Sequence, residues 1–356
     1  MNFRSPRLQL CAAGALAATC LAAAVASADE PERGVLVLAS TNDPSSNGVI
    51  VFTLDTTGTP SLSFVDALTT GGKGGASTNA GILQFQQDRG AVANFGSNSV
   101  TALIREAGSV RVAGTIKLAS GCLKPDSVAL TKEHLFIAGA NCAETHAWPS
   151  GAVEGAIVPL PDPSAAQIAV GARWGAVTLA SGSVLQLPLT REGTLSGAAV
   201  PVVLPGNADN TPLGAAFWND ILGFTPAHSP DSFAIVDREG SVFPITGPTP
   251  PFPTNAPCWV AKGPGNAWYT GNSPGHAISI FFSDGRGGVF YKSVPLAGAP
   301  TDVTVSHDRK WLAVIYSAGG DAHVEVFAID AYGDLPPFAT SSSVGVTAFN
   351  GVAISE

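Results

Sequence analysis

The chain has 356 residues, of which 18 are basic and 27 acidic, and Lys and Arg form no run along it. A chain with this acidic balance lacks the electropositive surface that nucleic acids and anionic lipids require, so neither is an expected partner. Forty Gly, 27 Pro and one Met, with little helical periodicity, are typical of an all-β protein with many tight turns.

The N-terminal 28 residues have the pattern of a secretory signal peptide. Arg4 and Arg7 precede an apolar stretch over 8–25, and Ala26-Ser27-Ala28 forms a small-x-small cleavage site. Lipid attachment at Cys20 is disfavoured by the Ala17-Ala18-Thr19 that precedes it. No other apolar run approaches the roughly 20 residues that span a bilayer. We therefore expect residues 29–356 to be periplasmic or secreted, without membrane association.

A short pattern recurs along the rest of the chain: a polar or small residue, an apolar residue, a small residue and an apolar residue. Successive copies begin 40 to 49 residues apart, which is the spacing of propeller blades. Seven evenly spread copies predict one seven-bladed β-propeller domain over 29–356. The copies are Gly81-Ile82-Leu83, Ser127-Val128-Ala129-Leu130, Gln167-Ile168-Ala169-Val170, Gly214-Ala215-Ala216-Phe217, Trp259-Val260-Ala261, Asp302-Val303-Thr304-Val305 and Gly351-Val352-Ala353-Ile354.

Strands bounded by turn-forming residues can be assigned to each blade in chain order. The first three blades are expected at 35–40, 48–55 and 61–67; at 81–85, 90–94, 99–105 and 110–117; and at 127–131, 134–140 and 155–160, with a long loop insertion over 141–154. The next three are expected at 167–170, 175–180, 183–189 and 200–204; at 214–217, 221–224, 232–236 and 241–245; and at 259–262, 267–270, 277–283 and 289–294. The last is expected at 302–306, 311–316, 323–329 and near Phe338. Because the first blade lacks an inner strand before Val35, the C-terminal copy over 351–355 is expected to complete it and close the ring.

Three cysteines follow the signal peptide. Residues that face each other in an antiparallel hairpin have a constant index sum, and a turn centred on Lys132 sets this sum at 264. Cys122 and Cys142 satisfy that sum, which predicts a disulfide in an oxidising compartment. Cys258 is left over, and the prediction for it is a small buried residue in preference to a nucleophile.

Candidate site residues gather on one face of the predicted ring. Inner strands begin on the face that also carries the loops between second and third strands, and this face is the expected binding mouth. His146, His228, His276 and His323 fall in or beside such loops, whereas His134 and His307 fall on the opposite face. The beginnings of the inner strands add Asp126, Gln167, Trp259, Asp302 and Asn350, and the long insertion adds Glu144 and Trp148.

These residue types suit general acid and base catalysis. Glu144 or Asp302 could activate water and His146 could protonate a leaving oxygen, with Asp126, Gln167, Trp259, His228, His276 and Asn350 binding the substrate. The alternative is that the histidines are solvated, the aspartates cap turns and Trp259 packs. No metal-binding spacing, phosphate loop or Gly-x-Ser-x-Gly elbow occurs, so neither a metal nor a cofactor is expected.

The blade motifs resemble those of the lactonase-type seven-bladed propellers, which include bacterial phosphogluconolactonases and carboxymuconate cyclases. The resemblance lies in residues 92–100, Pro125-Asp126-Ser127-Val128-Ala129, Ala256-Pro257-Cys258-Trp259-Val260-Ala261 and Pro300-Thr301-Asp302-Val303. It implies an exported hydrolase of a small lactone or cyclic ester. The substrate is expected to be unphosphorylated, because a secreted protein without a basic cluster would not bind a cytosolic sugar phosphate.

Active members resemble one another in a His where this chain has Ser164, which favours a second hypothesis. In that hypothesis a monomeric propeller binds a small ligand or a protein partner without catalysis.

Overall fold

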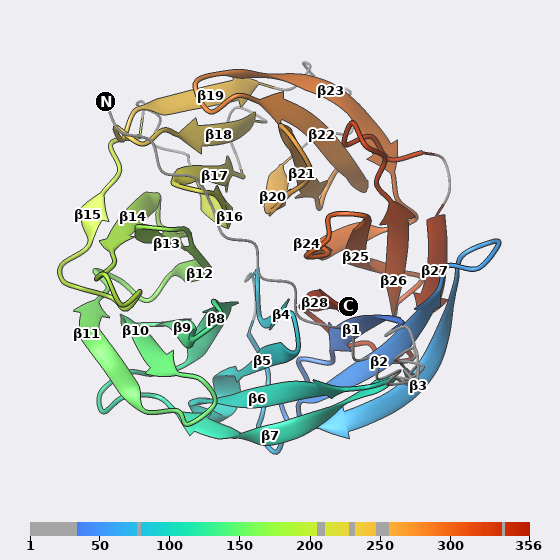
Figure 1. The fold of residues 1–356 in the computed structure, drawn as a ribbon, viewed down its shortest axis with the longest axis horizontal. Helices are drawn as coiled ribbons and strands as arrows, with labels where there is room; N and C mark the ends of the chain where they lie inside the picture. The colour runs from blue at the N-terminus through green and yellow to red at the C-terminus, as the bar shows by residue number, and fades with distance from the viewer. Residues whose placement is uncertain (1–33, 77–79, 205–210, 228–231, 247–255, 337–338) are drawn as a thin grey trace, which may run out of the picture. The chain divides into compact units, whose positions relative to one another are not determined.

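The computed structural model describes residues 34–76, 80–204, 211–227, 232–246, 256–336 and 339–356. Over these ranges the chain forms seven four-stranded antiparallel sheets arranged around a central channel, which is the predicted seven-bladed β-propeller (Figure 1). The predicted signal peptide lies outside the described residues. Within the described ranges, no helix has the length and apolar character needed to cross a bilayer.

The first four blades each contain four strands, named in order from the innermost outward. The first contains β28 (Val352–Ser355), β1 (Val35–Ser40), β2 (Gly48–Asp55) and β3 (Ser61–Thr69). The second contains β4 (Leu83–Gln86), β5 (Arg89–Asn94), β6 (Ser99–Glu106) and β7 (Ser109–Lys117). The third contains β8 (Pro125–Leu130), β9 (His134–Gly139), β10 (Cys142–Ala147) and β11 (Val153–Pro159). The fourth contains β12 (Ala165–Val170), β13 (Trp174–Leu179), β14 (Ser183–Pro188) and β15 (Val200–Pro201).

The last three blades follow the same order. The fifth contains β16 (Pro212–Trp218), β17 (Ile221–Pro226), β18 (Ser232–Val236) and β19 (Val242–Thr246). The sixth contains β20 (Pro257–Lys262), β21 (Ala267–Asn272), β22 (Ala277–Ser283) and β23 (Gly288–Pro295). The seventh contains β24 (Ala299–Val305), β25 (Trp311–Ala318), β26 (Asp321–Ala328) and β27 (Ala339–Ser343). All seven copies of the repeat lie in or directly before an inner strand, which confirms that the repeat marks the channel wall.

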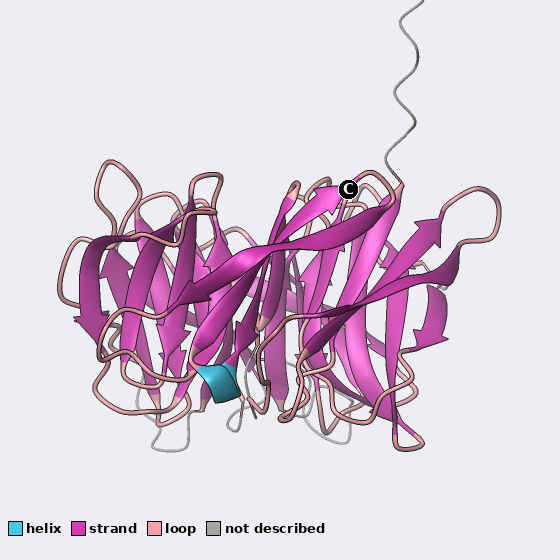
Figure 2. Cartoon of the chain, turned by 90° about the horizontal axis from the view of Figure 1, so that it is seen from below, coloured by secondary structure: helices cyan, strands magenta, loops and turns pink. Residues whose placement is uncertain are grey.

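The two faces of the ring are distinguished by the direction of the inner strands. We call the face where these strands begin the start face, and the face where they end the end face. Figure 2 shows the blades edge-on: the short 3-10 helix η1 (Phe95–Ser97) lies on the start face, and the C-terminus lies on the end face.

The ring is closed by pairing between the two ends of the chain. Strand β28 pairs antiparallel with β1, with Val37 opposite Ile354, as the sequence predicted. Arg105 of β6 reinforces this closure from the second blade, because its guanidinium donates hydrogen bonds to the Ser355 carbonyl and hydroxyl and to the Gly34 carbonyl. One buried side chain therefore binds the last residue of β28 and the residue directly before β1.

The expectation of a long loop over 141–154 is wrong. Residues Cys142–Ala147 form β10, the third strand of the third blade, and the segment expected as that third strand is its fourth strand, β11. The alternation of apolar and polar residues is hidden in this strand because Glu144 and His146 occupy buried positions on one face of β10. The two side chains bind each other, so an ion pair takes the place of the usual apolar residues.

The disulfide between Cys122 and Cys142 is present, with 5.7 Å between the two Cα atoms. Pro125 faces Gly139, which matches the predicted index sum of 264. Between this pair and the turn, a β-bulge shifts the register by one residue. The third cysteine, Cys258, is buried, and burial raises the pKa of its thiol to about 11. A thiol with this pKa is a poor nucleophile, in keeping with a packing role.

Deleting residues 347–356 should abolish cooperative folding, because it removes β28 and leaves β1 as an unpaired edge. Thermal unfolding followed by circular dichroism measures the effect, with Ser355→Ala as a control that loses one hydroxyl but keeps the strand. A truncated protein that melts at the full-length temperature would contradict the closure by β28.

Replacing both Cys122 and Cys142 by Ser should lower the free energy of unfolding by about 3 kcal/mol, since the bond closes a loop between residues 20 apart in sequence. Urea titration of the oxidised protein and the double variant tests this difference. Reduction of the wild type should reproduce it, and a midpoint unchanged by reduction would show that the bond does not form.

Candidate functional site

The centre of the start face is closed by the backbone of Ala80 and Gly81. The Ala80 N–H donates to the Ala166 carbonyl of the fourth blade (3.1 Å), and the Gly81 carbonyl accepts a bond from the Val128 N–H of the third blade (2.8 Å). The Gly81 N–H donates to Asp302 Oδ2 of the seventh blade (3.3 Å). These two residues thus form a roof over the channel, and the positive φ of 65° at Gly81 suits a glycine.

Asp302 holds this roof in place. Its carboxylate also accepts bonds from the N–H groups of Val352 (3.3 Å) and Val303 (2.9 Å), so it joins the seventh, first and second blades. The side chain is 2% exposed, and burial raises its pKa to about 7 against the opposing effect of the three hydrogen bonds. The expected position of Asp302 in an open mouth is therefore wrong, because its oxygens face backbone amides inside the protein.

Four other residues expected at the mouth are all buried: Asp126, Gln167, Trp259 and Asn350. Of these four, Gln167 lines the channel cavity described below. The Trp259 indole donates to the Pro300 carbonyl (2.9 Å) inside a core cluster, which supports its packing role.

The histidines expected on the start face are dispersed. His276 lies exposed in the turn between β21 and β22, and His323 stacks on Tyr316 within the seventh blade, with 5.6 Å between ring centroids. His228 lies outside the described residues.

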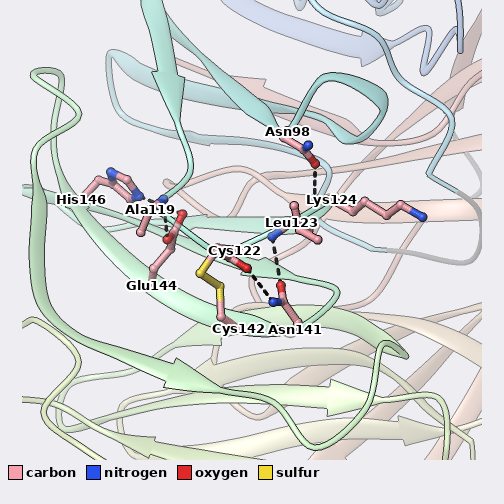
Figure 3. The surroundings of a disulfide bond; sticks show 10 residues. Asn98, Ala119, Cys122, Leu123, Lys124, Asn141, Cys142, Glu144 and His146 are labelled. Carbon is pink, nitrogen blue, oxygen red and sulfur yellow. Dashed lines mark hydrogen bonds and ion pairs between the residues drawn. A yellow bond between two sulfur atoms is a disulfide. The ribbon is translucent and has the colours of Figure 1, made fainter.

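Glu144 and His146 form a buried ion pair beside the disulfide (Figure 3). His146 Nε2 lies 3.0 Å from Glu144 Oε1 and Nδ1 lies 2.9 Å from the Gly151 carbonyl, while Glu144 Oε2 accepts the Ala119 N–H (2.9 Å). The side chain of His146 is 0% exposed and that of Glu144 is 1% exposed. Burial lowers the pKa of His146, but its bonds to Glu144 and Gly151 and the charge of Glu144 outweigh burial and raise it. The geometry is that of a structural element, and the catalytic roles expected of the pair stay predictions.

One group of three potential metal ligands occurs in the described part of the chain: Cys122, Cys142 and Glu144. Its two sulfur atoms are joined in the disulfide, so neither is the thiolate that a metal requires. This group therefore does not fit a metal ion.

A cavity of about 200 Å³ occupies the channel below the roof. Its walls come from the inner strands of blades two to seven, and the residues at the last strand positions are partly exposed, so it opens toward the end face. The lining residues are Gln84, Ala129, Leu130, Gln167, Ile168, Ala169, Val170, Ala215, Ala216, Phe217, Val260, Ala261, Lys262, Val303, Thr304 and Val305. Because the repeat places small residues on the inner strands, room remains between them for this cavity. A few polar side chains interrupt its otherwise apolar wall.

Lys262 is the one ionisable side chain among the described residues that line this cavity. Its Nζ donates to the carbonyls of Gly263 (2.7 Å), Gly265 (2.7 Å) and Ala267 (3.1 Å). Burial, with a smaller effect from the charge of Arg309, lowers its pKa to about 7. Both the ammonium and the neutral amine are therefore populated near neutral pH.

Two indole rings further fix the position of the amine. Lys262 Nζ lies 4.9 Å from the ring centroid of Trp218 and 5.2 Å from that of Trp268. Because the stem and the amine are both held by packing, Lys262 occupies a defined place at the end face.

Sequence reasoning missed Gln84, Thr304 and Lys262. The signal was present, because Thr304 occupies the small position of its repeat and Lys262 directly follows that position in Trp259-Val260-Ala261. The binding site was expected where the inner strands begin, so residues further along these strands were not among the candidates.

Comparison with known proteins gives structural relatives alone. No family model matches the chain, and no curated protein matches it by sequence. Among solved structures, the periplasmic gluconolactonase of Pseudomonas aeruginosa is 14% identical with a TM-score of 0.64, over 90% of this chain and 98% of that one. Virginiamycin B lyase from Staphylococcus aureus is 13% identical with a TM-score of 0.56, over 80% and 92%. A protein of unknown function from Desulfotomaculum acetoxidans is 14% identical with a TM-score of 0.65, over 91% and 99%.

The chain has the fold of the lactonase-type propellers. At these identities the likeness extends to the fold and not to the chemistry, and the lyase shows that one propeller architecture carries more than one reaction. A function for this propeller therefore has to be inferred from its own channel.

The buried ion pair makes stability depend on pH. The raised pKa of His146 means that its stabilisation is complete below the unfolded value of 6.5 and is lost as pH rises through the folded value. Urea titrations of the wild type and of His146→Gln from pH 6 to 9 should therefore show a difference in the free energy of unfolding that shrinks as pH rises. At pH 6 the variant should be less stable by about 3 kcal/mol, because it leaves Glu144 buried without its partner. The raised pKa of Asp302 and the lowered pKa of Lys262 act in both proteins and cancel in this difference. The exposed His276→Gln serves as the control, and a difference between wild type and His146→Gln that does not change with pH would contradict this assignment.

Proposed function

We propose that the protein is an exported lactonase-like hydrolase that opens a small, unphosphorylated lactone or cyclic ester inside the channel cavity. The observation that carries this proposal is the composition of the cavity lining: uncharged carboxamides at the closed end, an apolar wall, and at the open end one lysine, Lys262, with a pKa of about 7. A small cavity with a few convergent polar groups suits a compact ring compound.

The charge of the cavity supports an unphosphorylated substrate. A phosphate group is normally bound by several Arg or Lys side chains or by a row of free backbone amides. In this cavity the single cationic side chain already directs its N–H groups to the carbonyls of Gly263, Gly265 and Ala267. A neutral ring compound therefore matches the cavity better than a sugar phosphate.

Lys262 supplies the base in the proposed reaction. In its neutral form the amine keeps two N–H donors for the surrounding carbonyls and offers its lone pair to a water molecule. As the water oxygen attacks the lactone carbonyl carbon, Lys262 takes the water proton. The ring C–O bond then breaks and the leaving oxygen recovers that proton from Lys262, giving a hydroxy acid. A base with a pKa near the working pH is suited to both transfers.

Export rests on two features of the chain. The Cys122–Cys142 disulfide is compatible with an oxidising compartment, and Ala26-Ser27-Ala28 has the pattern of a signal cleavage site. A protein exported in this way would meet extracellular lactones and not the phosphorylated intermediates of the cytosol.

A second function, ligand binding without catalysis, is favoured by one specific observation. Ser164 holds a turn before β12, because its hydroxyl and its N–H both donate to Asp162 Oδ1. The position where lactonases of this type resemble one another in a His is thus structural in this chain. If Lys262 does not act as a base, the cavity would hold a ligand and leave it unchanged.

A pH-indicator assay against a panel of unphosphorylated lactones tests the proposal. The wild type should hydrolyse at least one of them, with kcat/KM rising with pH through about 7 as Lys262 loses its proton. Lys262→Met should lower kcat at least 100-fold because it removes the base and keeps the apolar stem. Lys124→Met, a lysine change outside the cavity, should leave the rate unchanged. Turnover that survives in Lys262→Met would contradict this mechanism, and no turnover from a folded protein would favour the binding function.

A further inference from the structure

We propose that the carboxamides of Gln84 and Gln167 form a recognition subsite that binds the carbonyl oxygen of a ring compound at the closed end of the channel. This inference rests on the proposed function for its choice of ligand, and it states that the protein recognises the ligand by its carbonyl group. It identifies the ligand class as cyclic carbonyl compounds, meaning lactones and their amide analogues, as distinct from cyclic ethers.

The two carboxamides converge beneath the roof. A β-carbon added to Gly81 would lie 3.2 Å from Gln84 Nε2 and 3.2 Å from Gln167 Nε2. Because Gly81 has no side chain, both amide nitrogens can lie this close to its backbone. Both side chains line the cavity, although Gln84 comes from the second blade and Gln167 from the fourth.

The orientation of Gln167 is fixed by a hydrogen bond to the protein. Its Oε1 accepts the Ala215 N–H of the neighbouring blade (2.7 Å), which identifies the other terminal atom as the Nε2 donor. Within the described ranges this Nε2 has no protein acceptor. Gln167 therefore offers N–H groups at the closed end while its oxygen stabilises the ring of blades.

Gln84 is free to adapt to a ligand. No hydrogen bond joins its carboxamide to any described residue, and the side chain is partly exposed in the cavity. The third polar group nearby, Ser127 Oγ, is already used, because it accepts the Ile168 N–H (3.1 Å) and donates to the Gly81 carbonyl (3.4 Å). The donors left for a ligand are thus those of the two glutamines.

Two amide donors match an acceptor with two lone pairs. A carbonyl oxygen has this arrangement. The wall beside the subsite is apolar, with Ile168, Ala215 and Val303, so a ligand that leaves the amides unpaired would bind poorly. A pocket of this kind rejects an analogue that lacks the acceptor more strongly than it rejects a change in apolar size.

Binding of δ-valerolactam, a six-membered cyclic amide that resists hydrolysis, tests the subsite. Ligand-observed NMR should show binding to the wild type at least tenfold tighter than that of tetrahydropyran, which has the same ring size and no carbonyl. Gln84→Met should weaken lactam binding about tenfold, since it keeps the length of the side chain and removes its donors. Gln86→Met, the same change on the same strand but outside the cavity lining, should leave binding unchanged.

Gln167→Glu gives a second and independent variant. The glutamate retains an oxygen that accepts the Ala215 N–H, so the fold should be kept, and it replaces the Nε2 donor by an acceptor. Lactam binding should fall at least tenfold, with thermal melting confirming that the variant is folded.

The outcomes separate this inference from the proposed function. If lactones are not hydrolysed but the lactam binds in a Gln84-dependent manner, the hydrolase proposal fails and the subsite stands. If lactones are hydrolysed while Gln84→Met and Gln167→Glu keep the wild-type KM and lactam affinity, the subsite is wrong and the hydrolase proposal stands. Equal binding of tetrahydropyran and lactam, or no binding of lactam to the folded wild type, would overturn the subsite.

Discussion

The carboxylate of Asp302 is the constraint on which the arrangement of the channel depends. It accepts backbone N–H bonds at Gly81, Val303 and Val352, and through them it ties the seventh, first and second blades together where the ring closes. Because this carboxylate fixes Gly81 across the axis, the channel is closed at the start face. The described cavity opens toward the end face, where the residues at the last positions of the inner strands are partly exposed.

The site follows from the repeat that builds the propeller. Small residues in the repeat allow the inner strands to converge and still leave a cavity of about 200 Å³. Polar residues at a few positions then supply all of its hydrogen-bonding groups. Gln84 and Gln167 place uncharged donors at the closed end, and Lys262 places an amine at the open end.

Much of the fold could be predicted from the sequence because it depends on local repetition. The spacing of the repeat predicted the seven inner strands, the missing first strand predicted the closure by β28, and the index sum predicted the Cys122–Cys142 disulfide. The site could be predicted only in part, because burial of a polar residue depends on partners distant in sequence. The sequence does not show that β10 buries Glu144 and His146 as a pair, and it does not show that Asp302 binds backbone N–H groups of other blades.

A crystal structure of the protein with δ-valerolactam bound is the most direct test of the channel cavity as the functional site. We expect the lactam in the channel below Gly81, with its carbonyl oxygen within hydrogen-bond distance of the Gln84 and Gln167 carboxamides and its ring on the side toward Lys262. A lactam bound instead on the start face, with the channel unchanged, would contradict the central claim that the channel cavity is the functional site.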